Sequence, residues 1–191
     1  MDRALVARRY THSATQEIHA MNALRLFRPS FLAASILVSA LVASAQTPGT
    51  ILHAPEASKV LPDSVYYAGK SANTQLRNSA GVHFADGHYV LAVLVDTSGY
   101  SSTIQEKYQA YFLTEVPLEV GGHPLVPGAY GVGFVGDHFD VMDIGNHDVL
   151  QTPDRHDDRM QRPMPLQILD GDAPGRYRLC FGRTCVPFHR P

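Results

Sequence analysis

Positive charge is scarce in this chain once its first 45 residues are set aside. The remaining 146 residues carry 11 lysines and arginines against 16 aspartates and glutamates, which gives a net charge of −5 with histidine neutral. A nucleic-acid-binding domain needs a basic footprint, so this balance argues against nucleic acid as a partner. The sequence also has no basic amphipathic stretch of the kind that binds a membrane surface. The length suffices for one domain with a sizeable core and not for two ordinary domains.

Long apolar runs are also rare, and the one that is present lies near the N-terminus. It covers residues 31–42 and follows Arg25 and Arg28. The run is shorter than the roughly 20 apolar residues that a membrane-spanning helix needs, so a membrane anchor is the less favoured alternative. Basic residues before a short apolar run are typical of a secretory signal peptide. We therefore expect no membrane span in the mature chain.

The signal peptide sets the expected boundaries of the chain. Small residues at Ala43 and Ala45 fit the cleavage rule, so we expect the mature protein to begin at Gln46. No cysteine follows this site to carry a lipid anchor, and the protein is expected in the periplasm or outside the cell. The predicted parts are an upstream extension or mis-assigned start over 1–20, a signal peptide over 21–45, a flexible leader over 46–64 and a β-sandwich domain over 65–191.

Turn residues between alternating apolar residues predict antiparallel strands. Gly136-Asp137 separates GVGFV from HFDVMDI, which indicates a two-residue hairpin turn. This turn pairs Val135 with His138 and directs the bulky residues of both strands to one face, the core. Gly131 and Gly133 then lie on the other face, where glycines leave room for something to approach the sheet.

A second hairpin is predicted at Asp86-Gly87, between GVHFA and HYVLAVLVD. A two-residue turn there would place Phe84 opposite Tyr89. His83 and His88 would then share the outward face as a diagonal pair. The expected core side carries Val82, Phe84, Tyr89, Leu91, Val93 and Val95.

The segments between these hairpins are less regular. The spacing of Ser102 and Gln105 predicts a short helix through Ala110, although the same residues would also suit a strand. Residues 111–120 should be extended and broken at Pro117. Together these signals predict an all-β protein, an antiparallel β-sandwich of about seven to nine strands.

The only two cysteines of the chain lie in a third predicted hairpin. A turn at Gly182-Arg183 places Cys180 opposite Cys185, close enough for a disulfide on the outer side of the sheet. Export to an oxidising compartment favours the bond. A reactive cysteine pair is the alternative, but no helix start adjoins these thiols to lower their pKa.

Two of these segments resemble a known family. Residues 120–130 read VGGHPLVPGAY and residues 181–186 read FGRTCV. They resemble the IGG-x-x-LPAG-x-Y hairpin and the closing W-x-K-T-x-V hairpin of an exported bacterial family of unknown function. Phenylalanine for tryptophan, arginine for lysine and the added cysteine depart from the family pattern. The resemblance covers about half of the mature chain, implies a β-sandwich and supplies no catalytic residues.

Eight histidines in the mature chain raise the question of a metal site. Imidazole and carboxylate groups suit zinc or copper, and shared faces make His83, His88, His138 and Asp140 the candidate ligands. Exposed surface histidines are the competing explanation. Asp96-Thr97-Ser98-Gly99 departs from the aspartic-protease signature and favours an Asx-type turn instead, while the charged residues 151–163 indicate a solvated loop.

These observations favour a non-enzymatic binding or structural module without a cofactor. Its expected partner is a small molecule, a glycan or an envelope protein. The alternative is a divalent-metal-binding protein or a metal-dependent hydrolase that uses the four candidate ligands. A third possibility is a fold whose only task is assembly with a partner chain.

Overall fold

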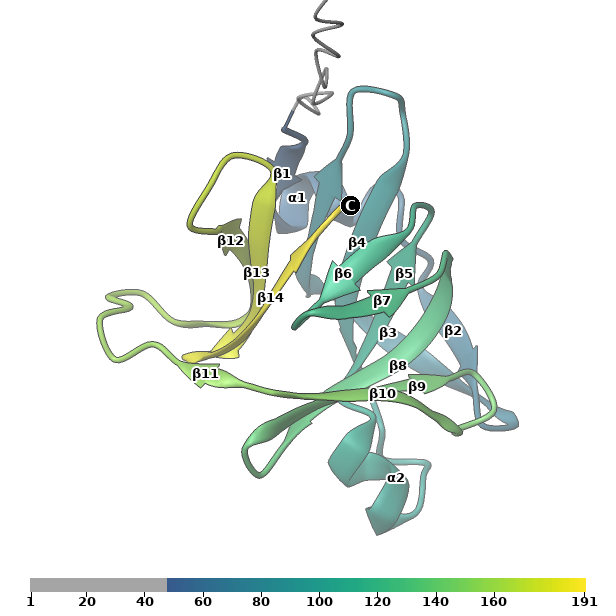
Figure 1. Cartoon of the computed structure of the whole chain (residues 1–191). Helices are drawn as coiled ribbons and strands as arrows, with labels where there is room; N and C mark the ends of the chain where they lie inside the picture. The colour runs from purple at the N-terminus through teal and green to yellow at the C-terminus, as the bar shows by residue number, and fades with distance from the viewer. Residues whose placement is uncertain (1–47) are drawn as a thin grey trace, which may run out of the picture. The chain divides into compact units, whose positions relative to one another are not determined.

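The computed structural model describes residues 48–191. The upstream extension, the signal peptide and the cleavage position between Ala45 and Gln46 lie outside the described residues. Fourteen strands and two short helices form this part of the chain (Figure 1). Their bounds are β1 Thr50–Leu52, α1 Ala54–Ala57, β2 Ser64–Tyr67, β3 Lys70–His83, β4 Tyr89–Val95, α2 Ser102–Lys107, β5 Ala110–Thr114, β6 Leu118–Val120, β7 His123–Leu125, β8 Gly128–Val135, β9 His138–Asp143, β10 Asp148–Pro153, β11 Arg155–His156, β12 Met164–Asp170, β13 Arg176–Gly182 and β14 Thr184–His189.

The strands form two antiparallel sheets, which confirms the predicted all-β, sandwich-like class. The larger sheet has eight strands in the order β1-β3-β4-β5-β8-β9-β10, with β2 paired to β3. The smaller sheet has six strands in the order β12-β13-β14-β6-β7, with β11 paired to β14. The strands outnumber the expected seven to nine because β1, β6, β7 and β11 have only two or three residues each, too few for a visible alternation.

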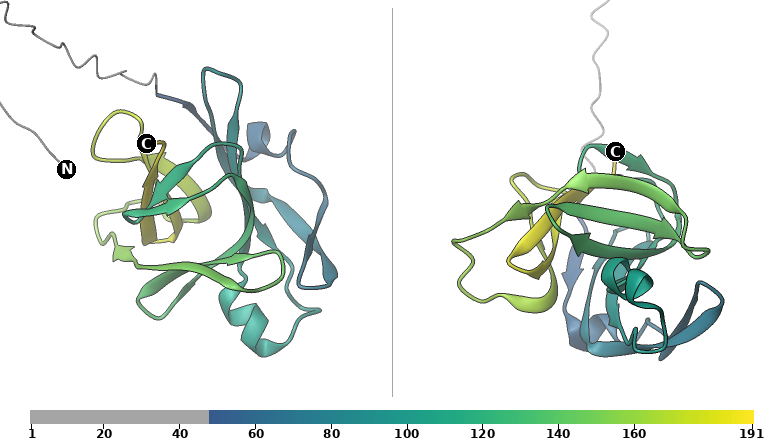
Figure 2. Two further views of the ribbon diagram at one scale, coloured as in Figure 1. Left: turned by 45° about the vertical axis from the view of Figure 1, so that its right-hand side comes forward. Right: turned by 90° about the horizontal axis from the view of Figure 1, so that it is seen from below.

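The chain passes between the two sheets three times, from β5 to β6, from β7 to β8 and from β10 to β11, and the last crossing leads to the site described below. Strand β10 is an edge of the larger sheet, and after Asp154 the chain enters β11, which pairs with β14 of the smaller sheet. The views in Figure 2 follow this crossing from one sheet to the other. The segment after β10 was expected to be a solvated loop, but its pairing with the smaller sheet fixes its position.

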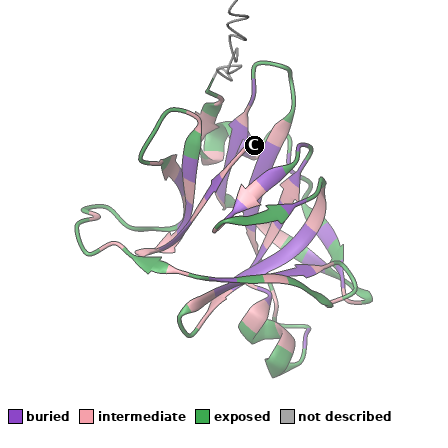
Figure 3. Cartoon of the chain, viewed as in Figure 1, coloured by how far each residue is buried: buried purple, intermediate pink, exposed green. Residues whose placement is uncertain are grey.

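The main core lies between the sheets. Figure 3 colours the buried residues purple along the strands of both sheets. The β8–β9 hairpin has the predicted register, with Val135 opposite His138 around Gly136, whose φ is +63°. The core residues of this hairpin are Tyr130, Val132, Phe139 and Val141, and the smaller sheet contributes Leu166, Ile168, Tyr177, Leu179, Val186 and Phe188.

The β3–β4 hairpin differs from the prediction by one residue. His83 pairs with Tyr89, and the N–H of Phe84 donates to the carbonyl oxygen of His88 at 2.9 Å. The loop therefore holds three residues rather than two, and Gly87 takes the left-handed conformation with φ +88° that such loops use. A slip of one residue moves every following side chain to the other face of its strand.

This slip changes which residues of β4 face the core. Val90 and Ala92 lie in the core between the sheets, whereas Leu91 and Val93 lie on the outer face of the larger sheet. The expected core positions of Tyr89, Leu91, Val93 and Val95 are thus wrong, while those of Val82 and Phe84 are correct. The outward residues are still buried, because another part of the chain covers them.

The covering segment is the one that was expected to be a flexible leader. Ala57 and Leu61 pack with Leu91 and Val93, and β1 pairs with β3. In addition, the N–H of Gly49 donates to the Tyr177 hydroxyl at 2.6 Å. Residues 49–64 therefore belong to the domain. A three-residue strand and a single helical turn are too short to show a period in the sequence.

Helix α2 covers the outer face of β8, as Figure 2 shows in its right-hand view. The prediction of a helix is confirmed, but the helix ends at Lys107 rather than continuing through Ala110, which begins β5. Its cap is Ser101 rather than Ser102, and Gln105 donates to the carbonyl of Tyr100. A Cβ on Gly133 would lie only 2.1 Å from the carbonyl oxygen of Lys107. The glycines of β8 thus make room for the protein's own chain.

We expect Gly133→Ala to lower the free energy of unfolding by about 1–3 kcal/mol, because the added methyl group would push the end of α2 off the sheet. The matched control is Gly99→Ala, where a Cβ meets no atom within 4 Å. Urea unfolding of both variants measures the difference. Equal stabilities would contradict the close approach of α2 to β8.

Candidate functional site

The site is built on the disulfide hairpin of the smaller sheet. Cys180 and Cys185 are direct partners across β13 and β14, with their Cα atoms 4.1 Å apart, and their sulfur atoms are bonded. The turn contains Gly182 with φ +60°, which confirms the predicted hairpin. Leu179 and Val186 face the core, so the sulfur atoms lie on the outer face of the sheet, as expected.

Both cysteines are nevertheless buried, because the segment after β10 folds over them. Strand β11 places Arg155 directly beside Cys185. From the hairpin turn, the guanidinium of Arg183 donates to the carbonyl oxygens of Asp157 at 3.3 Å, Asp158 at 3.2 Å and Met160. One side chain thus binds three carbonyl oxygens of the covering loop.

A carboxylate fixes the same loop from the other side. Asp157 accepts a hydrogen bond from the Arg178 guanidinium at 2.8 Å and another from the backbone N–H of Arg159 at 3.1 Å. The Arg178 guanidinium, assisted by these backbone contacts, lowers the pKa of Asp157 below its usual range. Asp157 is therefore an ionised anchor of the loop.

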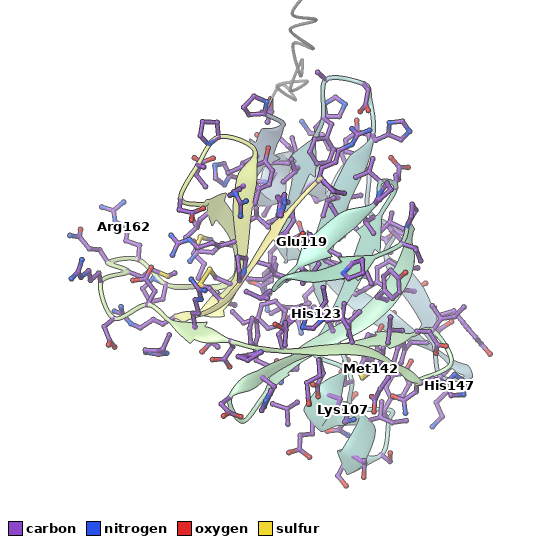
Figure 4. The ribbon with its side chains drawn as sticks, in the orientation of Figure 1. Lys107, Glu119, His123, Met142, His147 and Arg162 are labelled. Carbon is purple, nitrogen blue, oxygen red and sulfur yellow. A yellow bond between two sulfur atoms is a disulfide. The ribbon has the colours of Figure 1, made fainter. Side chains whose placement is uncertain are left out.

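A pocket of about 420 Å³ lies between this loop and strand β14. Two of its arginines, Arg155 and Arg159, make no ion pair with any residue in the described part of the chain. Arg162 lies further out on the same loop and points away from both sheets (Figure 4). The pocket is lined by Arg155, His156, Asp157, Asp158, Arg159, Arg178, Cys185 and Pro187.

The four predicted metal ligands do not come together. With three residues in the β3–β4 loop, His83 and His88 no longer share a face of the hairpin. His83 stacks on Tyr89 with ring centroids 4.4 Å apart, and His88 contacts Asp86 at 3.1 Å. The predicted pairing of these two histidines is therefore wrong.

The two hairpins that carry the candidate ligands are also far apart. Three strands separate β3 from β9, so at about 4.8 Å per strand these strands lie roughly 19 Å apart. Zinc ligands lie about 2 Å from the metal, so one ion cannot be shared across this distance. Within residues 48–191, no group of three or more histidine, cysteine, aspartate or glutamate residues could hold a metal ion.

Asp140 and the histidines have local partners instead. Asp140 is buried and accepts a hydrogen bond from Gln151 at 2.7 Å. It lines a smaller cavity of about 250 Å³ with Asp148, whose carboxylate pairs with Lys107 at 3.0 Å. The other local pairs join His138 to Asp137 at 2.6 Å, His147 to Asp143 at 3.0 Å and His156 to Asp158 at 3.4 Å.

The segment that departs from the protease signature forms the expected Asx-type turn. The Asp96 carboxylate accepts a hydrogen bond from the backbone N–H of Ser98 at 3.0 Å. This hydrogen bond lowers the pKa of Asp96 below its usual range. The Asp96 carboxylate therefore has a structural role, which is to close the turn after β4.

No family model, curated protein or solved structure matches this chain. The resemblance of its two hairpins to the exported family therefore stays a prediction. No helix within residues 48–191 is long and apolar enough to cross a membrane. The site is therefore interpreted from its own geometry.

The pocket residues were missed in the sequence because residues 151–163 have the composition of a solvated loop. A signal was present in the distribution of cations. Seven of the eight arginines after residue 45 follow residue 150, whereas all three lysines precede it. This concentration of arginine near the disulfide hairpin indicates that several arginines form contacts between the hairpin and the loop. It does not show which arginines are left without an ion pair.

Contacts at the β3–β4 turn predict a pH dependence. A hydrogen bond from the Arg190 guanidinium to Asp86, at 2.6 Å, is the main cause that lowers the pKa of this carboxyl to about 2. A lowered folded-state pKa contributes stability above the unfolded value near 3.9, and this contribution is lost as the pH falls through about 2. Arg190→Gln should therefore flatten the loss of stability between about pH 4 and pH 2.

The measurement is urea unfolding across that pH range. Arg176→Gln is the matched control. Arg176 is exposed on β13, which neighbours the strand before Arg190, and its side chain makes no ion pair within the described residues. An Arg190→Gln variant whose acid profile follows that of the control would contradict the assigned contact.

Proposed function

We propose that the protein is an exported, non-enzymatic binding module whose ligand occupies the pocket between residues 155–159 and strand β14. The observation that carries this proposal is a cavity of about 420 Å³ whose wall is held in place by Arg183 and Asp157. Small-molecule sites usually have volumes of about 300–1,000 Å³. A wall that is already fixed reduces the entropy lost on binding.

Export is supported by two independent features. The basic and apolar pattern of residues 21–45 is typical of a signal peptide, and the disulfide Cys180–Cys185 suits an oxidising compartment. The compartment that we propose is the periplasm or the cell exterior. The resemblance to an exported bacterial β-sandwich family points in the same direction.

The chemistry of the pocket favours binding over catalysis. The sulfur of Cys185 is committed to the disulfide, so it cannot act as a thiolate nucleophile. Asp157 is held by Arg178, and His156 contacts the exposed Asp158. These groups position the loop, and the ligand that we propose is a small molecule or the end of a glycan or envelope polymer.

The proposal is tested by titrating the isotope-labelled mature protein with a panel of sugars, sugar acids and dicarboxylates, followed by amide NMR. We expect a binder whose shift changes centre on residues 155–159 and 185–187. Arg183→Gln should weaken that binding, because it removes the hydrogen bonds that hold the loop against the disulfide hairpin. Arg176→Gln is the matched control, since Arg176 is exposed and its side chain makes no ion pair among the described residues. Shift changes centred elsewhere, or equal binding by both variants, would contradict the proposed site.

A further inference from the structure

We infer that the pocket selects ligands through a negatively charged group, a carboxylate or a sulfate, held between the guanidinium groups of Arg155 and Arg159. This inference rests on the proposed function, because it names the class of ligand for the same pocket. It is based on which charged side chains around the cavity already have a partner and which do not.

Of the two acidic side chains of the pocket, Asp157 is paired with an arginine and Asp158 is exposed. The Asp157 carboxylate accepts from Arg178 at 2.8 Å, and Asp158 contacts His156 at 3.4 Å. A cationic ligand would have to displace Arg178 from a bond that anchors the loop. The less exposed of the two carboxylates is therefore not available to a cationic ligand.

Two of the basic side chains are left without such a partner. Arg178 is bound to Asp157, whereas Arg155 and Arg159 form no hydrogen bond or ion pair through their guanidinium groups within residues 48–191. Both line the cavity, and both backbones are fixed, Arg155 by pairing with Cys185 and Arg159 by its N–H bond to Asp157. Two exposed arginines without a partner in the described chain are thus attached to fixed backbone positions beside the cavity.

Guanidinium groups match the geometry of a planar or tetrahedral oxyanion. Each presents several N–H donors in a rigid fork, which can donate two parallel hydrogen bonds to a carboxylate. Two such groups at one cavity suit an anion with two or three oxygen atoms. A neutral ligand would leave these donors without a charged acceptor.

The distribution of charge along the chain supports the same ligand class. Residues 48–150 carry four lysines and arginines against eleven acidic residues, whereas residues 151–191 carry seven arginines against five aspartates. The segment that carries the pocket therefore has a net charge of 7 − 5 = +2, whereas residues 48–150 have a net charge of 4 − 11 = −7. A positive local charge favours the approach of an anion.

The experiment compares D-glucuronate with D-glucose, which share a ring and differ in the carboxylate, and adds inorganic sulfate as the simplest anion. Amide NMR titrations locate the binding and give dissociation constants. We expect glucuronate to bind at residues 155–159 and glucose not to bind there. Binding should weaken as sodium chloride is raised, because salt screens the charge.

Variants assign the anion to its two arginines. Arg155→Gln and Arg159→Gln should each weaken glucuronate binding at least about tenfold. Arg159→Lys should lie between Arg159→Gln and the parent protein, since it keeps the charge and loses the fork. The control is Arg77→Gln, an exposed arginine on the larger sheet, which should bind as the parent protein does. Urea unfolding confirms that each variant is folded.

The outcomes separate the inference from the proposed function. Equal binding of glucuronate and glucose at the pocket would overturn the inference and leave the proposed function standing. Binding of neither sugar nor sulfate there would overturn the inference, and a hit from the wider panel would still uphold the binding module. Sulfate that binds as tightly as glucuronate supports a general oxyanion site, and tighter glucuronate supports a sugar acid.

Discussion

One guanidinium group, that of Arg183, holds together the part of the structure that carries the proposed site. It extends from the disulfide hairpin and donates to three carbonyl oxygens of the loop that covers Cys180 and Cys185. Those carbonyls would otherwise be satisfied only by water. The Asp157–Arg178 ion pair and the pairing of β11 with β14 hold the same loop at its other contacts. The pocket exists because the disulfide hairpin and this loop are fixed to each other.

On the outer faces of both sheets, segments of the chain cover its own strands. The segment around α1 covers Leu91 and Val93, helix α2 covers the glycines of β8, and the loop after β11 covers the disulfide. Antiparallel sheets usually leave one face to solvent, and the alternating pattern of the sequence predicts such a face for each hairpin. Here the outer layers bury further apolar surface. The loop after β11 differs from the other two covering segments because the pocket beneath it is lined by charged residues. Such a pocket is suited to a polar ligand.

Features set by a few neighbouring residues could be predicted from the sequence, and features set by distant contacts could not. Gly136-Asp137 and Gly182-Arg183 gave the correct registers, and the disulfide followed from the second. Asp86-Gly87 carries the same kind of signal, yet Ala85 joins its loop, and that single residue separated His83 from His88. Loop length depends on how the strands pack as well as on the turn residues. The pocket was not predictable, because it requires residues 155–160 to meet a hairpin about 25 positions later.

The most direct test of the proposed site is a crystal structure of the mature protein grown with glucuronate. The account predicts electron density for the sugar acid inside the pocket, with its carboxylate oxygens within hydrogen-bond distance of the Arg155 and Arg159 guanidinium groups and the loop contacts of Arg183 unchanged. Density for the ligand elsewhere on the protein, with these two arginines paired to acidic side chains of the chain itself, would contradict it.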